Sequence, residues 1–188
     1  KIGIIGPGRL GRSLAVLLDA AGRTAQLIGR GQSIPSVDVV LLTVPDRAIA
    51  GVAASIPTGQ VVLHCSGACE VEILRPHRPA GSLHPLMTFP GPEIALPDLN
   101  GVPAAVAGDP RAVEVARQLA ADLGMRAFEV HGDRRLYHAA AVMAGNFSTV
   151  LLAEAARVLA AAGVDPAEAS ALLAPLALQF YRTRDRTR

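Results

Sequence analysis

Short apolar segments alternate with amphipathic stretches through the first two thirds of the chain. Strand-like segments occur at residues 2–5, 24–28, 37–44, 60–64, 81–84, 101–107 and 126–130. Between several of them, apolar residues at three- and four-residue spacing predict helices, the first carrying Leu10, Leu14, Leu17 and Leu18. This alternation predicts an α/β domain over residues 1–131, with a Rossmann-like, mostly parallel sheet and helices on both faces.

The last third of the chain has a different pattern. From Asp133 to Ala162 the residues favour a helix and are mostly apolar on every side, and Asp165-Pro166 begins a second helix. A helix that is apolar all round has to be buried all round, and one further helix cannot cover it. We therefore predict an incomplete all-α domain over residues 132–188, which contributes to a substrate cleft and forms a homodimer. Helices missing from a truncated C-terminus are the alternative to a second subunit.

Three local features bear on the topology. Few residues separate Gly29 from the run at 37–44, so either the sheet is abbreviated after Arg30 or the sequence lacks residues there. Pro103 cannot donate a backbone hydrogen bond, which favours a position near a sheet edge. Asp109 comes directly before a proline and is expected to cap a helix.

The first strand-like run leads into a glycine pattern, Gly6-x-Gly8-x-x-Gly11, and then into the first helix. In this context Gly6 permits a tight turn, Gly8 lets a pyrophosphate approach the backbone, and Gly11 lets the helix pack on the strand. Free N–H groups at the positive end of the helix dipole would bind the diphosphate. A structural turn that binds nothing is the alternative. We predict a dinucleotide site that includes Gly6, Pro7, Gly8, Arg9, Leu10 and Gly11.

The segment after the second strand-like run indicates which dinucleotide would bind. Folds that prefer NAD carry an acidic residue there for the ribose 2′-hydroxyl, whereas this chain has Gly29-Arg30-Gly31-Gln32-Ser33. A carboxylate would repel a 2′-phosphate, while Arg30 and Ser33 could bind one. We therefore predict NADP as the cofactor, with NAD less favoured and with contacts from Gly29, Arg30 and Ser33. An exposed loop arginine is the alternative for Arg30.

Further contacts are expected where the central strands end. In an open parallel sheet, ligands bind beyond the carboxyl ends of the strands. Thr43, Val44 and Pro45 follow one strand-like run, and Ser66 and Gly67 follow the next. We include these five residues in the predicted cofactor site.

Composition and charge exclude several classes of protein. The 188 residues are 51% hydrophobic, which suits a packed core rather than a disordered chain. The formal net charge of +2 favours neither nucleic acid nor an acidic membrane as a partner. The sequence shows no signal peptide and no long uncharged apolar run, and its two cysteines cannot form a disulfide framework, so we expect a cytoplasmic protein. It has neither a C-x-x-C pair nor an H-E-x-x-H motif, and we predict no metal site.

Five short motifs occur in order along the chain: Gly6-x-Gly8-x-x-Gly11, Val44-Pro45-Asp46, His64-x-Ser66-Gly67, Ser82-x-His84-Pro85, and Tyr137-His138 followed by Asn146-Phe147. In this set the chain resembles a family of oxidoreductases with a Rossmann-like, NADP-binding N-terminal domain and a helical C-terminal domain of uncharacterised function. The architecture is also similar to that of pyrroline-5-carboxylate reductase, ketopantoate reductase and the β-hydroxyacid dehydrogenases. Family members usually continue with further helices, so the resemblance implies that residues are missing after Arg188.

Similarity to the β-hydroxyacid dehydrogenases implies an Asn on the interdomain helix, preceded four residues earlier by a catalytic Lys. Asn146 fits this pattern, but the position four residues before it is Val142, so the Lys-based mechanism does not transfer. His138 lies about 12 Å from Asn146 along a helix axis, at ~1.5 Å per residue, so both could line one elongated cleft. His138 could donate the proton that accompanies hydride transfer, with His84 as its rival. A buried structural role is the alternative for each histidine.

These inferences predict an NADP-dependent oxidoreductase that transfers a hydride between the nicotinamide and a small carbonyl or imine. The candidate catalytic residues are His138, Asn146 and His84. A protein that binds or senses NADP without turnover is the alternative, because the expected Lys is absent. The sequence does not identify the substrate.

Overall fold

The computed structural model describes residues 1–184, with side chains as far as Gln179. This part of the chain forms two compact units, the first covering Lys1–His138 and the second beginning at Ala139. The predicted domain boundary between residues 131 and 132 stays a prediction, because a division by contacts does not show which segments fold independently.

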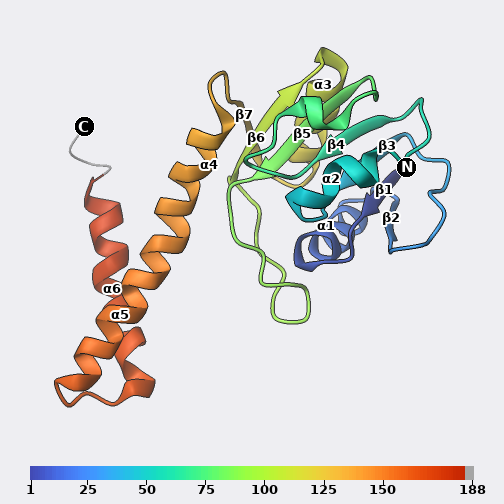
Figure 1. Ribbon diagram of the computed structural model, residues 1–188. Helices are drawn as coiled ribbons and strands as arrows, with labels where there is room; N and C mark the ends of the chain where they lie inside the picture. Colours follow the sequence, from blue (N-terminus) through green and yellow to red (C-terminus); the bar gives the residue numbers. More distant parts are fainter. Residues whose placement is uncertain (185–188) are drawn as a thin grey trace. The chain divides into compact units, whose positions relative to one another are not determined.

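Seven strands of the described chain form one sheet in the first unit (Figure 1). Their order is β2-β1-β3-β4-β5-β6-β7; β1 to β5 are parallel to one another, whereas β6 is antiparallel to β5 and parallel to β7. The predicted α/β class, with a Rossmann-like and mostly parallel sheet, is confirmed. The strands are β1 (Ile2–Ile5), β2 (Ala25–Ile28), β3 (Val39–Leu42), β4 (Val61–His64), β5 (Ala80–Pro85), β6 (Pro103–Gly108) and β7 (Arg126–Glu129).

Helices cover both faces of this sheet, as predicted. Helices α1 and α3 contribute to one hydrophobic core, and α2 and the 3₁₀ helix η1 contribute to the other. In β3, Leu41 belongs to the first core, whereas Val40 and Leu42 belong to the second. Both faces of the central strands are buried, which is why they appear in the sequence as continuous apolar runs. The helices are α1 (Arg9–Ala20), α2 (Asp46–Ala53), η1 (Val71–Leu74) and α3 (Pro110–Asp122).

The connection from β2 to β3 is short and irregular. Residues 29–38 contain neither a helix nor a strand. Strand β3 nevertheless pairs directly with β1, with Ile2 opposite Val39, on the side away from β2. An irregular segment therefore occupies the place of the usual helix at this crossover.

Two local predictions differ in detail from the structure. Pro103 begins β6, which lies between β5 and β7 rather than at an edge; a strand tolerates proline at its first residue. Asp109 is the N-cap residue of α3 and Pro110 follows it, as predicted, but within the described residues its carboxylate makes no capping hydrogen bond. That carboxylate instead accepts from the backbone N–H of Ala80 at 2.8 Å and pairs with Arg78. Asp109 therefore ties the start of α3 to β5.

One continuous helix, Arg134–Ala161, extends from the first unit into the second. It consists of α4 (Arg134–Val142), a π-helical turn η2 (Met143–Phe147) and α5 (Ser148–Ala161). After it, α6 (Pro166–Arg184) packs against α5. The predicted all-α character of the C-terminal region is confirmed.

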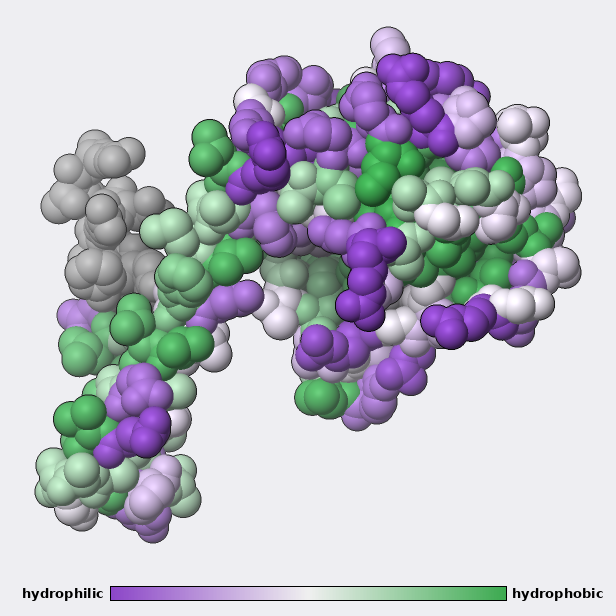
Figure 2. Space-filling view, in the orientation of Figure 1, coloured by the Kyte–Doolittle hydropathy of each residue, from purple (hydrophilic) through white to green (hydrophobic). Residues whose placement is uncertain are grey.

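Many large apolar side chains of the second unit are exposed. Figure 2 shows hydrophobic residues spread over the surface of its helices. Surface of this kind marks a contact site, since soluble monomers rarely expose large apolar patches. The predicted homodimer through these helices stays a prediction. The residues more than half exposed include Met143, Phe147, Val150, Leu151, Val158, Leu172, Leu176 and Leu178.

The helix Arg134–Ala161 also has the length and mean hydropathy of a membrane span, although only 6% of its most apolar window is buried. Helices that pack against protein partners meet the same two criteria. Glu154 and Arg157 form an ion pair on this helix, with 3.1 Å between Arg157 Nη1 and Glu154 Oε1. Length and composition alone therefore do not indicate a span.

Candidate functional site

The carboxyl ends of four parallel strands lie next to one another at one edge of the sheet. Ile5 of β1 pairs with Leu42 of β3, and Leu42 pairs with His64 of β4, so these strands end at one level. Strand β5 pairs with β4 and ends at the same edge. The glycine-rich turn and the residues that follow β3, β4 and β5 are therefore neighbours, as the predicted topology requires.

The turn between β1 and α1 has the geometry that its glycines predict. Gly6 has a φ of +119°, a conformation that side chains rarely adopt. The hydroxyl of Thr43 donates to the carbonyl oxygen of Gly6 at 2.8 Å. A Cβ atom on Gly11 would lie 2.1 Å from that same oxygen, so no side chain fits there. Thr43, predicted as a cofactor contact, thus also fixes the turn.

Gly8 differs from the other two glycines of the motif. A Cβ atom on Gly8 would meet no atom within 4 Å, so packing does not require glycine at this position. Gly8 is the N-cap of α1, and no side chain of the described residues caps the helix. The N–H groups of the first helical turn remain free to bind an anion at the positive end of the helix dipole. This open cradle, which a Cβ atom would fill, fits a diphosphate.

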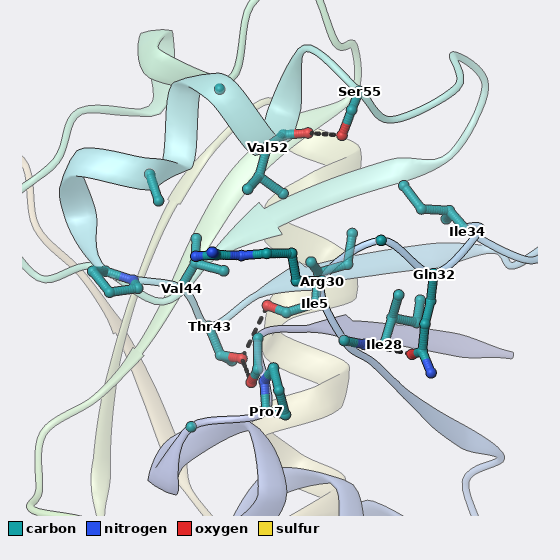
Figure 3. A pocket seen from close by; sticks show the side chains of 17 residues that line it. Ile5, Pro7, Ile28, Arg30, Gln32, Ile34, Thr43, Val44, Val52 and Ser55 are labelled. Atoms are coloured by element: carbon teal, nitrogen blue, oxygen red, sulfur yellow. Dashed lines mark hydrogen bonds between the residues drawn. The ribbon is translucent and has the colours of Figure 1, made fainter.

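A cavity of about 540 Å³ opens beside this turn (Figure 3). Its walls come from the glycine-rich turn, the β2–β3 connection, the residues after β3, and α2. Figure 3 shows the side chain of Arg30 extending across the cavity toward Val44. A volume of this size suits a small-molecule ligand. The predicted cofactor residues that line the cavity are Gly6, Pro7, Gly8, Gly29, Arg30, Thr43, Val44 and Pro45.

The other predicted cofactor residues do not line this cavity. Arg9 and Ser33 are exposed, and Leu10 contributes to the core on the α1 face of the sheet. Gly11 packs under the turn, and Ser66 and Gly67 lie farther along the same edge, beyond β4. Their predicted contacts with a cofactor stay predictions.

Sequence reasoning also missed part of the wall. Gln32, rather than Ser33, lines the cavity, and its Oε1 atom accepts from the backbone N–H of Gly29 at 2.6 Å. Partly buried residues of α2, Ala48 and Val52, also line the cavity, together with Ser55 just after the helix. The sequence did contain a signal for this part of the wall. Small and apolar residues share one side of a helix that follows a strand next to the glycine-rich turn.

Histidines cluster where β4 and β5 end. The backbone N–H of Ser66 donates to Nδ1 of His64 at 3.2 Å. Nδ1 of His84 lies 2.7 Å from the hydroxyl oxygen of Tyr137, the fourth residue of α4. The rings of His84 and His138 are in edge contact, with 6.0 Å between centroids. The two rival candidates for the proton donor are therefore neighbours, and Tyr137 joins them.

Gly67 leaves room for this cluster. A Cβ atom on Gly67 would lie 2.6 Å from Nδ1 of His138 and 2.9 Å from both Cε1 and Nε2 of His84. The predicted role of Gly67 as a cofactor contact stays a prediction. Its visible role is to let the turn after β4 approach two imidazole rings.

Arg134 belongs to the cluster, although the sequence analysis passed over it. Its side chain is only 2% exposed, and Nη2 donates to the carbonyl oxygen of Ser66 at 2.9 Å. Its Nε and Nη1 atoms are buried without a hydrogen-bond partner in the described chain. Arg134 is the first residue of α4, where the helix dipole disfavours a cation. That unfavourable position was the signal in the sequence.

The surroundings keep two of the histidines neutral at pH 7. Burial, together with a smaller effect of the positive charge of Arg134, lowers the pKa of His64 to about 4. Burial likewise lowers the pKa of His84 to about 4, with additional effects from His138 and Arg134. Burial also raises the pKa of Tyr137, so its phenol is protonated at pH 7. At pH 7 His84 is therefore a neutral imidazole that can form hydrogen bonds, and only a very small fraction of it is imidazolium.

Two further features limit the chemistry that is available where the parallel strands end: the state of the Cys65 thiol and the set of possible metal ligands. Cys65 is buried, and burial raises the pKa of its thiol to about 12, which makes it a poor nucleophile. Within the described residues, no group of three or more His, Cys, Asp or Glu side chains could hold a metal ion, the histidine cluster included.

Asn146 lies in the second unit, on the π-helical turn η2, and is exposed. Turns of this kind are frequent at functional sites. Its predicted contribution to catalysis stays a prediction.

Two family models match the chain. Residues 24–90 match a Rossmann-like domain, and residues 102–185 match a domain of unknown function, DUF2520. This pairing confirms the family resemblance drawn from the five motifs. A search of curated proteins found no match to this chain.

Solved structures share the whole architecture. Protein TM1727 from Thermotoga maritima is 25% identical, with a TM-score of 0.75 over 100% of this chain and 80% of its own. The 1-pyrroline-5-carboxylate reductase from Streptococcus pyogenes is 17% identical, with a TM-score of 0.71 over 100% of this chain and 80% of its own. A reductive aminase from Aspergillus terreus, in complex with NADPH and ethyl levulinate, is 16% identical, with a TM-score of 0.76 over 98% of this chain and 74% of its own. The chain thus shares its fold with a 1-pyrroline-5-carboxylate reductase and with a reductive aminase solved with NADPH.

Proposed function

We propose that this protein is an NADP-dependent oxidoreductase that reduces a small carbonyl or imine. One observation carries the proposal: the cavity beside the glycine-rich turn and the histidine cluster lie at the same edge of one parallel sheet, beyond adjacent strands. A dinucleotide held along that edge would extend from the first group toward the second. The fold shared with two reductases supports this reading.

The residues present fit the cofactor. The free N–H groups at Gly8 and the start of α1 would hold the diphosphate, and the guanidinium of Arg30 would pair with a 2′-phosphate. The β2–β3 connection carries no carboxylate near Arg30 to oppose that phosphate. NADPH would supply the hydride when bound.

The histidine cluster would supply the proton. The sequence favours His138 as the donor, whereas the geometry favours His84. Nδ1 of His84 lies 2.7 Å from the hydroxyl oxygen of Tyr137, whereas Nδ1 of His138 is buried without a partner within the described residues. The contact with Tyr137 is therefore what favours His84. The low exposure of this cluster would also keep bulk water from the reacting atoms.

A fluorescence titration tests the cofactor. We expect NADPH to bind at least about tenfold more tightly than NADH, because Arg30 adds a charge-assisted pair that only NADPH can make. Arg30→Ala should abolish this preference while leaving the NADH affinity nearly unchanged. Arg126→Ala, which removes an equal charge from an exposed position on β7, should change neither affinity. Failure of both nucleotides to bind would overturn the proposal, and tighter binding of NADH would overturn the phosphate contact.

A sensor that binds NADP without turnover is the second candidate. Val142 favours it, since this residue occupies the position of the Lys that the β-hydroxyacid dehydrogenases would supply. Oxidation of NADPH in the presence of a panel of small ketones, keto acids and cyclic imines separates the two functions. Tight NADPH binding without turnover of any panel member would favour the sensor.

A further inference from the structure

Tyr137 has no role in the function proposed so far, yet it makes the closest polar contact in the histidine cluster. Its hydroxyl lies 2.7 Å from Nδ1 of His84, and the two rings meet edge to face with 5.6 Å between centroids. We propose that Tyr137 is a positioning residue that donates its hydroxyl hydrogen to Nδ1 of His84 and so fixes the tautomer whose proton, on Nε2, is offered to the substrate. The inference rests on the proposed function for the substrate class, a carbonyl or imine.

The direction of this hydrogen bond follows from the surroundings. A phenol and a neutral imidazole can each donate or accept, so distance alone does not decide. The Tyr137 hydroxyl has no second hydrogen-bond partner among residues 1–179. The buried cation of Arg134 is close enough to favour negative charge on the phenol oxygen. Such a cation attracts the oxygen lone pairs and turns the hydrogen away, toward Nδ1.

The charged groups around His84 keep its ring neutral. Arg134 and His138, both on α4, disfavour a second proton on the ring, and Asp46 of α2 favours one. Burial has the largest effect and also acts against the charged form. A neutral ring that accepts at Nδ1 must carry its hydrogen on Nε2.

Nε2 of His84 is the ring nitrogen that the contact with Tyr137 leaves available. It lies against Gly67, where a Cβ atom would be 2.9 Å away. It is absent from the fully buried atoms that lack a hydrogen-bond partner in the described chain, which include Nε2 of His64 and Nδ1 of His138. The proposal requires a small substrate atom to reach this N–H group.

His84, Tyr137 and water together can supply the one proton that the reaction consumes. For a carbonyl substrate, the hydride forms the new C–H bond, and the π-electron pair of the C=O bond moves to oxygen. That oxygen takes the Nε2 proton of His84, Nδ1 takes the hydroxyl proton of Tyr137, and the phenolate regains a proton from water. Arg134 would stabilise the phenolate while it lasts, as the sign of its effect on Tyr137 requires.

Nitrogen NMR of the protein labelled at its histidines tests the tautomer without cofactor or substrate. We expect His84, assigned with the His84→Gln variant, to show a protonated Nε2 and an unprotonated Nδ1 at pH 7. Tyr137→Phe should convert this signature to a mixture of both tautomers. A protonated Nδ1 in the wild type, or an unchanged signature in Tyr137→Phe, would overturn the inference.

Kinetics with any substrate found for the proposed function gives the second readout. Tyr137→Phe should lower kcat by roughly tenfold or more and leave the dissociation constant for NADPH unchanged, since the hydroxyl acts on the proton and not on cofactor binding. Full turnover by a folded Tyr137→Phe protein would overturn the relay.

The two proposals fail in different ways. An absence of turnover with every substrate removes the proposed function and the proton relay with it, but the NMR signature still decides whether Tyr137 fixes the tautomer. A wrong tautomer in an active enzyme removes only the role of Tyr137. Circular dichroism of each variant excludes loss of fold as the cause.

Discussion

The imidazole of His138 lies so close to Gly67 that a single methyl group added there would sit 2.6 Å from its Nδ1 atom. The same methyl group would press on His84, 2.9 Å away. Gly67→Ala should therefore displace both rings and cost about 1–3 kcal/mol of stability, the usual range for overpacking. Gly132→Ala is the matched control, because its Cβ atom would meet nothing within 4 Å. Urea unfolding of the two variants measures the difference, and equal stabilities would contradict the packing.

Substitutions at two glycines of the glycine-rich turn should have different effects, one on stability and the other on cofactor binding. Gly11→Ala forces a Cβ atom to 2.1 Å from the carbonyl oxygen of Gly6, so we expect it to destabilise the first unit severely. Gly8→Ala meets no atom of the protein and should leave the melting temperature nearly unchanged. Its methyl group would instead occupy the space for the diphosphate and weaken NADPH binding by about tenfold or more. Retained affinity in Gly8→Ala would place the diphosphate elsewhere.

The two histidines in edge contact should differ in their effect on turnover. His84→Gln should lower kcat by roughly 10² or more with little change in NADPH affinity, because it removes the open N–H donor. His138→Gln should have a smaller effect, since the Tyr137 hydroxyl lies against His84 and would orient that ring as the donor. A large loss in His138→Gln and full activity in His84→Gln would return the role to His138. Activity that survives both changes would mean that neither histidine supplies the proton.

Stability should fall as the pH is lowered from about 6.5 to about 4. Unfolded histidine titrates near pH ~6.5, whereas His64 and His84 in the folded protein have pKa values of about 4. Between these values the unfolded chain binds more protons, so acid favours unfolding, by on the order of 2–3 kcal/mol for each ring at most. Urea unfolding at several pH values measures this slope.

His64→Asn is the variant that tests the origin of this slope. An Asn side chain can still accept the hydrogen bond from the N–H group of Ser66 but does not titrate. The variant should lose stability at pH 7 and show a flatter dependence on pH, and combining it with His84→Asn should flatten the curve further. A slope parallel to that of the wild type would show that other groups cause the acid sensitivity.

The exposed apolar side chains of the second unit predict a homodimer at micromolar concentration. Leu151 is 70% exposed on α5, and Leu151→Glu should shift the protein toward monomer because it places a charge in the expected contact. Ile94 is 77% exposed on a loop of the first unit, and Ile94→Glu should leave the assembly unchanged. Light scattering on the full chain decides, and a monomeric wild type would refute the dimer.

The period of the apolar residues was sufficient to predict the sheet. Continuous runs such as 37–44 have one physical cause, burial on both faces, and this cause dictates parallel strands covered by helices. The position of Pro103 at the start of an inner strand could not be predicted in the same way. Proline excludes a hydrogen-bond donor, and both an edge strand and the first residue of an inner strand satisfy that condition.

The candidate site was predictable only where local sequence determines it. The glycine-rich turn depends on neighbouring residues, and its geometry followed from its motif. The contact between Tyr137 and His84 joins residues 53 positions apart, and no local pattern encodes it. The position of Arg134 at a helix start is unfavourable for a cation and so was a weak signal, but its burial follows from tertiary packing, which no local pattern encodes.

The contrast between the two cysteines has a practical consequence. Cys65 is buried with an unreactive thiol, while Cys69 is partly exposed and lies in the turn whose N–H groups bond to Ser66. Maleimide dyes should therefore label the folded chain almost exclusively at Cys69. A fluorophore at that position, a few residues from the histidine cluster, would give an optical signal for ligand arrival without any change to the sequence.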